Sequence, residues 1–225
     1  MTFSISARCA RTGMFGIAVS SSSPCVAARC AHARAGIGVV ATQNITDPML
    51  GPRGLDLLAS GRPAPDALAQ LIANSNHIEY RQIALVDKQG RTASFSGRNT
   101  LGTHRAVEMP NVVAAGNLLS SPNVPQAMVD RFLLLEDRHL ATRLIAAMQA
   151  AVEAGGEEGP VHSVGMLIVR EVGWPIADLR VDWREADPIG ELARLWELWE
   201  PQMEAYVTRG IDPSGAPSYG VPGDV

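Results

Sequence analysis

The sequence predicts an α+β fold with four layers, an α/β/β/α sandwich in which two mainly antiparallel sheets are stacked and helices cover both outer faces. Polar and apolar residues alternate from the first residues onward, as in a strand. Helical segments then arrive in pairs between groups of strands, which disfavours βαβ winding. The strands carry small and apolar residues on both sides, so both faces of each sheet need a cover. We expect one domain over residues 1–209 and a Gly/Pro-rich tail over residues 210–225.

The first strand group comes from the N-terminal part of the chain. Residues 2–9 alternate so that Phe3 and Ile5 share one face of a strand and Thr2 and Ser4 share the other. A turn at residues 10–13 leads into a second strand over residues 14–20, which predicts a hairpin. A third β-rich run covers residues 37–43. The chain therefore begins with a sheet.

In the rest of the chain, pairs of predicted helices alternate with groups of predicted strands. The predicted segments, in chain order, are helices at 52–60 and 65–74, strands at 81–86, 91–96 and 111–115, helices at 121–136 and 139–154, and strands at 164–170 and 176–182. Asp187-Pro188 predicts the start of a last helix that carries Trp196 and Trp199. We expect Pro201 to kink or divide this helix.

Composition limits the classes of partner. The net charge is −4, and no Lys/Arg cluster with interleaved aromatic residues occurs, so we expect neither a nucleic acid nor a membrane partner. The N-terminus lacks a signal-peptide pattern, and Cys9, Cys25 and Cys30 are an odd count that suits reduced thiols, so we expect a cytoplasmic protein. We also expect a homo-oligomer, with the tail or the last helix against a neighbour.

Two patterns that suggest a cofactor or a metal are weak. Residues 36–41 match the dinucleotide fingerprint G-x-G-x-x-A, but the glycines open a predicted strand where the motif requires them to follow one. Cys25, Cys30 and His32 are close in sequence, yet a fourth metal ligand at a convincing spacing is missing. We therefore expect no cofactor and no metal, and packed free thiols.

Thr2 is the candidate nucleophile. A small residue after an initiator methionine generally allows removal of Met1, which would leave Thr2 with a free α-amine beside its own hydroxyl, a nucleophile and a base in one residue. The plainer interpretation is that many proteins begin with Met-Thr for no functional reason. An ordered strand from residue 2 onward favours the nucleophile.

Other polar residues occur where predicted strands end, so that they can project into a common cleft. These candidates are Ser20, Ser21, Ser22, Gln43, Asn44 and Asn117. For Asn117 we consider a hydrogen-bond donor to an oxyanion and, equally, a simple turn residue. For the serines a polar turn is the alternative. His162 opens a predicted strand and is an outlying candidate for substrate binding.

Five ordered motifs resemble the bacterial family called domain of unknown function 1028. They are Thr2-Phe3-Ser4-Ile5, residues 35–43, residues 51–55, residues 116–119 and residues 177–182. The resemblance implies the N-terminal nucleophile hydrolase superfamily and its α/β/β/α sandwich.

The same resemblance implies hydrolysis of a small amide or peptide-like substrate by Thr2, with the α-amine as base. Proteasome-like members use a lysine near the nucleophile, whereas the sole lysine here, Lys88, lies in a predicted turn. Acylase-like members use Arg and Asn, so Arg8, Gln43, Asn44 and Asn117 become candidates to orient the amine and bind the oxyanion. The alternative function is a catalytically silent sandwich that binds a ligand or a partner, through the cleft or the helix of Trp196 and Trp199.

Overall fold

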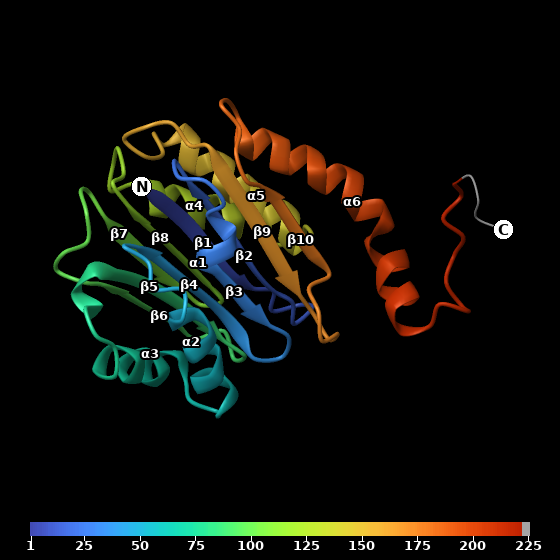
Figure 1. The fold of residues 1–225 in the computed structure, drawn as a ribbon, viewed down its shortest axis with the longest axis horizontal. Coiled ribbons are helices and arrows are strands. Elements are labelled where there is room, and N and C mark those ends of the chain that lie inside the picture. The colour runs from blue at the N-terminus through green and yellow to red at the C-terminus, as the bar shows by residue number, and fades with distance from the viewer. Residues whose placement is uncertain (222–225) are drawn as a thin grey trace.

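Two antiparallel β-sheets lie face to face in the computed structural model, which describes residues 1–221 (Figure 1). The larger sheet has the strand order β10-β9-β2-β1-β8-β7, and the smaller has the order β3-β4-β5-β6. Strands of the larger sheet are β1 (Thr2–Arg8), β2 (Phe15–Ser21), β7 (Arg105–Met109), β8 (Val112–Asn117), β9 (Ser163–Val169) and β10 (Ala177–Val181). Strands of the smaller sheet are β3 (Ala31–Arg34), β4 (Gly38–Asn44), β5 (Arg81–Asp87) and β6 (Thr92–Ser96).

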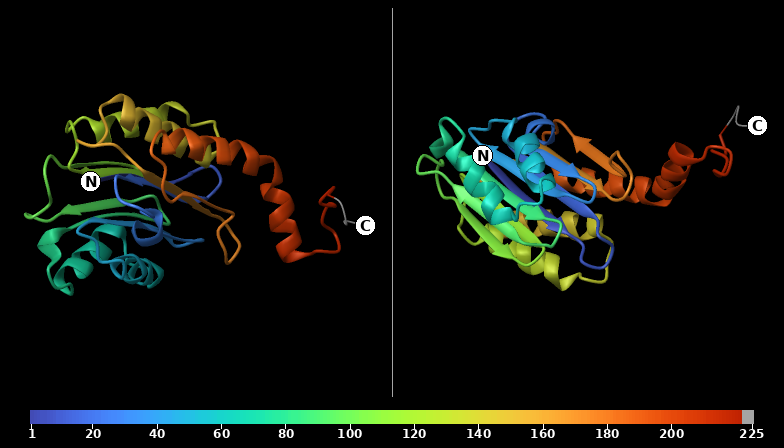
Figure 2. Two further views of the ribbon diagram at one scale, coloured as in Figure 1. Left: turned by 45° about the horizontal axis from the view of Figure 1, so that its top comes forward. Right: turned by 90° about the horizontal axis from the view of Figure 1, so that it is seen from below.

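Helices cover the outer face of each sheet (Figure 2). The smaller sheet packs against α2 (Leu50–Ala59) and α3 (Ala64–Ala73). The larger sheet packs against α4 (Val124–Leu134), α5 (Leu140–Glu153) and part of α6 (Pro188–Ile211). The predicted four-layer α/β/β/α sandwich is therefore confirmed. Two short elements, α1 (Ala27–Cys30) and the 3-10 turn η1 (Ile78–Tyr80), complete the described chain.

The alternation in β1 sorts its side chains between two layers. Phe3 and Ile5 are fully buried in the core between the larger sheet and its helices. Ser4 faces the smaller sheet, because its hydroxyl donates a hydrogen bond of 2.7 Å to Oε1 of Gln43 on β4. An apolar cluster that includes Phe15 and Val39 fills the rest of the space between the sheets. The strand β1 is therefore buried on both faces and lies in the middle of its sheet.

Four short elements were not predicted from the sequence, namely α1, η1, β3 and β7. The helix α1 and the strand β3 are four residues each, and β3 has no fully buried residue, so no hydrophobic period marks them. The strand β7 lies at the edge of the larger sheet, where Arg105, Glu108 and Met109 are exposed. Edge strands with one paired side tolerate such residues.

The last helix begins as predicted and continues through Pro201. The Asp187 side chain caps it by accepting a hydrogen bond from the Gly190 N–H. Pro201 does not divide α6, but the helix changes direction along its length as it leaves the body of the protein (Figure 2). Trp196 is buried and the Nε1 of Trp199 donates to the carbonyl of Ile176, so these tryptophans pack on the chain itself.

The predicted tail lies partly outside the described residues, which end at residue 221. In the described part of the tail, the Tyr219 ring lies against the end of α6, with its centre 3.7 Å from the Arg209 guanidinium. Among residues 1–221, every helix is too short or too polar to cross a lipid bilayer.

Candidate functional site

A row of four polar side chains crosses the larger sheet at the head of β1. In the antiparallel register Thr2 pairs with Ser21 on one side and with Asn117 on the other, and Ser21 in turn pairs with Ser163. Directly opposed residues point to the same face of a sheet, so the four side chains lie side by side on the face that meets the smaller sheet. All four are buried. The structure thus brings together Thr2, Ser21 and Asn117 from three of the predicted strand ends.

Buried amide side chains lie under this row. The Gln82 Oε1 atom accepts hydrogen bonds from Gln43 Nε2 at 2.8 Å and from Asn117 Nδ2 at 3.1 Å. The Gln82 Nε2 atom donates to the carbonyl of Gly116 at 3.0 Å, and Gln43 accepts from Ser4. Buried amides of this kind are held in one orientation when their hydrogen bonds are made. Asn117 is therefore fixed next to Thr2 by the smaller sheet.

Met1 covers Thr2. The Met1 carbonyl oxygen accepts hydrogen bonds from the Thr2 hydroxyl at 2.5 Å and from the Ser21 hydroxyl at 2.6 Å. The Met1 side chain packs against Gly159, where an added Cβ would lie 3.0 Å from the Met1 Cε atom. With Met1 attached, the Thr2 nitrogen is an amide and has no basic lone pair. Removal of Met1 would free the amine and uncover both hydroxyls.

Glu157 is a buried acid beside the chain terminus. Its side chain is 5% exposed, Oε2 accepts a hydrogen bond from the Ser22 N–H, and Oε1 has no hydrogen-bond partner among the described residues. Burial raises the pKa of Glu157 to about 7, although the charge of the N-terminal amine and the hydrogen bonds from Ser22 act in the opposite direction. This carboxyl group therefore changes its charge near neutral pH.

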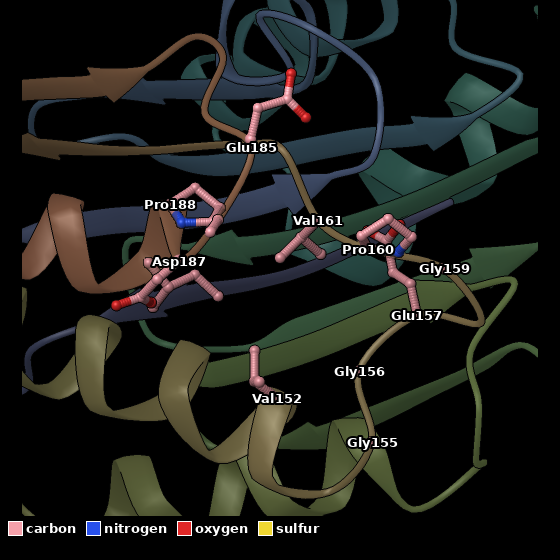
Figure 3. A pocket seen from close by; sticks show the side chains of 12 residues that line it. Val152, Gly155, Gly156, Glu157, Gly159, Pro160, Val161, Glu185, Asp187 and Pro188 are labelled. Carbon is pink, nitrogen blue, oxygen red and sulfur yellow. The ribbon is translucent and has the colours of Figure 1, made fainter.

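A cavity of about 400 Å³ opens beside the loop that carries Glu157. Its wall combines that loop with the segment leading into α6, and Figure 3 shows Val152 and Val161 facing the space between them. Pro160 and Pro188 add further apolar surface. Because Gly159 belongs to this wall and contacts Met1, the cavity adjoins the Thr2 end of β1.

Three other predicted residues lie at the same end of the sheets. Ser20 is buried on the opposite face, with its hydroxyl bonded to the carbonyl of Ser163, so it supports the sheet. Ser22 contributes its backbone N–H to Glu157. Asn44 has a positive φ of 74° and ties two loops together through the Tyr80 carbonyl and the Leu101 N–H. These contacts give Ser20 and Asn44 structural roles.

His162 and Arg8 are placed differently from the expected cluster. The His162 backbone N–H bonds to the Ser21 carbonyl, but its ring stacks on Trp183 with the centroids 4.4 Å apart, at the margin of the site. Arg8 ends β1, so the length of the strand separates it from Thr2, and its guanidinium bonds to Asn111. The structure does not bring Arg8 to the nucleophile.

The cysteine and histidine candidates for a metal do not gather. Cys25 is exposed, Cys30 is buried with its sulfur 3.7 Å from the Thr46 hydroxyl, and His32 approaches the Arg29 carbonyl. Within residues 1–221, no three His, Cys, Asp or Glu side chains are arranged to hold a metal ion.

Sequence reasoning missed Glu157, Gln82 and Ser163. Gln82 did carry a signal, because it is a polar residue inside an apolar strand and pairs across the sheet with Gln43. Glu157 carried none, since it follows two glycines that indicate only a helix end.

Comparison with known proteins agrees with this fold. The model of a family of unknown function, DUF1028, matches residues 2–192. The crystal structure of protein SPO2555 from Silicibacter pomeroyi, described with the same family, has a TM-score of 0.81 and 30% sequence identity and covers 88% of each chain.

More distant structures include Anbu, the ancestral beta-subunit, from Yersinia bercovieri, with a TM-score of 0.40, 12% identity and coverage of 91% of this chain and 97% of that one. Anbu from Hyphomicrobium sp. strain MC1 has a TM-score of 0.37 and 8% identity, with coverage of 92% and 98%. No curated protein matches the chain. Because the family model spans most of its length and a structural relative of that family is 30% identical to it, the chain belongs to the DUF1028 family.

Proposed function

We propose that the protein is an N-terminal threonine amidohydrolase or acylase of the cytoplasm, which cleaves a small amide or peptide-like substrate once Met1 has been removed. One observation carries the proposal. Thr2 heads the central strand of the larger sheet, and its neighbours across both adjacent strands are polar and buried. Ordinary packing at the centre of a sheet would favour apolar side chains there.

The chemistry follows from the groups around Thr2. The freed α-amine takes the hydroxyl proton, and the Thr2 oxygen bonds to the substrate carbonyl carbon. The substrate C–N bond breaks and the proton passes to the leaving amine. Water then hydrolyses the acyl ester and restores the hydroxyl. A free α-amine has an ordinary pKa of about 7.7 to 8.0, which suits a base at neutral pH.

Asn117 and Ser21 are the proposed partners of the reacting atoms. The Asn117 amide group has two N–H bonds, of which one is used by Gln82, so the second is available to an oxyanion. The Ser21 hydroxyl now donates a hydrogen bond to the Met1 carbonyl. After removal of Met1 it would bond instead to the freed Thr2 amine, because that nitrogen is the atom to which the Met1 carbonyl was attached. Gln43 acts through Gln82 and is a positioning residue.

Glu157 is the proposed counter-charge of the amine, and the cavity next to it is the proposed receptor for an apolar part of the substrate. Valine and proline in its wall fit an aliphatic group, whereas its acidic residues, Glu157, Glu185 and Asp187, disfavour an anionic one.

The first experiment measures the intact mass of untagged protein together with turnover on a panel of small amides. We expect a mass without Met1 and hydrolysis that Thr2→Ala abolishes. Thr2→Ser is the matched control, because serine keeps the hydroxyl, and alanine and serine are both small enough to permit removal of Met1. Thr2→Ser should therefore retain activity.

A second experiment isolates the amine. An uncleavable N-terminal extension leaves the Thr2 hydroxyl in place but keeps the nitrogen as an amide, so it should abolish hydrolysis. Active protein that retains Met1 in full would refute the mechanism. A folded protein that binds a substrate-like amide equally well as Thr2→Ala, without turnover by either form, would favour a silent binding protein.

A further inference from the structure

A second cavity, of about 260 Å³, lies at the far end of β1 from Thr2. Its wall comes from the end of β1, the turn before β8, the end of α4 and the start of α5. Three arginines line it, namely Arg8, Arg11 and Arg143. The volume is enough for a small ligand and too small for a drug-sized one.

Arg143 is the unusual member. Its side chain is 5% exposed, and its guanidinium lies 3.8 Å from the centre of the Phe132 ring. Its Nε donates to the Phe132 carbonyl near the end of α4, where backbone carbonyls carry partial negative charge. No carboxylate of residues 1–221 lies within ion-pair distance of Arg143. A buried guanidinium is unfavourable unless an anion compensates its charge.

The other two arginines are also without an acidic partner in the described part of the chain. Arg8 donates to the Asn111 side-chain oxygen at 3.1 Å, and Arg11 donates to the Asp137 backbone carbonyl at 2.9 Å. Each of these neutral contacts uses one nitrogen. A guanidinium has five N–H donors, so donors remain for a ligand.

The other polar groups of the cavity compensate the arginines only in part. Burial lowers the pKa of Arg143, and the charges of Cys9 and Glu136 act in the opposite direction without outweighing burial. Glu136 and Asp137 are exposed at the rim. Cys9 is buried in the wall, and burial raises the pKa of its thiol, but hydrogen bonds from Thr12 and the Arg11 N–H, together with the charge of Arg143, outweigh burial and lower the pKa. Even a thiol is therefore drawn toward the anionic form here.

We propose that this cavity binds a small oxyanion, a phosphate or carboxylate group, held by the guanidinium groups of Arg8, Arg11 and Arg143. The planar fork of arginine matches two oxygens of such an anion at once. The site is independent of Thr2, because it lies at the opposite end of the strand and shares no residue with the row of Thr2, Ser21, Asn117 and Ser163.

The test is calorimetric titration of the full chain with inorganic phosphate and, separately, with succinate, at constant ionic strength because unspecific charge effects depend on salt. We expect saturable binding of at least one of the two with one site per chain. The double substitution Arg8→Gln/Arg11→Gln should weaken binding by about tenfold or more, since each charge-assisted hydrogen bond contributes appreciably. Both side chains are partly exposed, so the variant should fold.

Arg105→Gln is the matched control, because Arg105 is an exposed arginine on β7 that does not line the cavity. It should bind as the unmodified protein does. Equal weakening by the control and the double variant would show general charge attraction and overturn the proposal. Absence of binding by both anions would overturn it as well.

Discussion

Replacing Glu157 by glutamine tests the account of the buried acid. Gln has the same shape and keeps an oxygen for the Ser22 N–H, but it cannot ionise. In the unfolded chain the carboxyl loses its proton near its ordinary pKa of 4.5, whereas in the folded chain it does so near 7. Between these values the folded state binds more protons, so its stability falls as pH rises.

The magnitude follows from the same two pKa values. Their difference corresponds to ~3 kcal/mol, at about 1.4 kcal/mol for each pH unit. That unfavourable contribution is nearly complete at about pH 8 and below ~1 kcal/mol at about pH 5. Glu157→Gln should therefore raise the free energy of unfolding relative to the unmodified protein by ~2 to 3 kcal/mol more at pH 8 than at pH 5.

The assay is urea unfolding of both proteins at the two pH values, followed by circular dichroism. Glu158→Gln is the control, because Glu158 is the exposed neighbour in the same loop, and it should change stability by less than about 0.5 kcal/mol at either pH. A difference between Glu157→Gln and the unmodified protein that is the same at pH 5 and pH 8 would refute the reasoning, since it would mean that Glu157 titrates alike in both states.

Two further substitutions test the buried polar groups. Gln82→Leu would leave the Gln43 and Asn117 amides and the Gly116 carbonyl without their Gln82 partner, so the free energy of unfolding in urea should fall by ~2 to 4 kcal/mol. Gln89→Leu, in an exposed turn, should lower it far less. Equal losses in the two variants would contradict the network. For Asp87, burial opposes ionisation, but hydrogen bonds from Ala64, Arg91 and Gln89 outweigh it and lower the pKa. Asp87→Asn should therefore cost ~1 to 3 kcal/mol at neutral pH. This gap should narrow as the solution is acidified below the ordinary pKa of 3.8, because the unfolded chain then binds the proton before the folded one does, and it should reach its smallest value once the folded carboxyl is protonated as well. A gap independent of pH would contradict this assignment.

The fold was largely readable from the sequence because hydrophobic period and helix pairing are local signals. The alternation of β1 predicted Phe3 and Ser4 on opposite faces, and in the structure Phe3 lies in the helix-side core and Ser4 between the sheets. The edge strand β7 and the short strand β3 were not predicted, because neither has a regularly buried face. Local patterns describe burial, and these strands have little of it.

The candidate site was readable only in part. Strand ends identified Thr2, Ser21 and Asn117, which the register brings side by side. Arg8 was grouped with them because acylase-like relatives use an arginine and because alternation places Arg8 on the same face as Thr2. Alternation fixes the face of a side chain but not its distance along the strand, and Arg8 lies at the other end of β1. The position of Glu157 depends on packing between distant segments, and no local pattern reports it.

The central position of β1 also sets an order of events during synthesis. Thr2 leaves the ribosome among the first residues, but its strand neighbour Asn117 is made much later, as are Glu157 and Ser163, which contact Ser22 and Ser21. Until then the N-terminus has no sheet on both sides and stays within reach of an aminopeptidase. After folding, the Met1 carbonyl is held by the Thr2 and Ser21 hydroxyls. An aminopeptidase would therefore meet an unpaired N-terminus before the last third of the chain has folded, and a half-buried Met1 held by two hydroxyls afterwards.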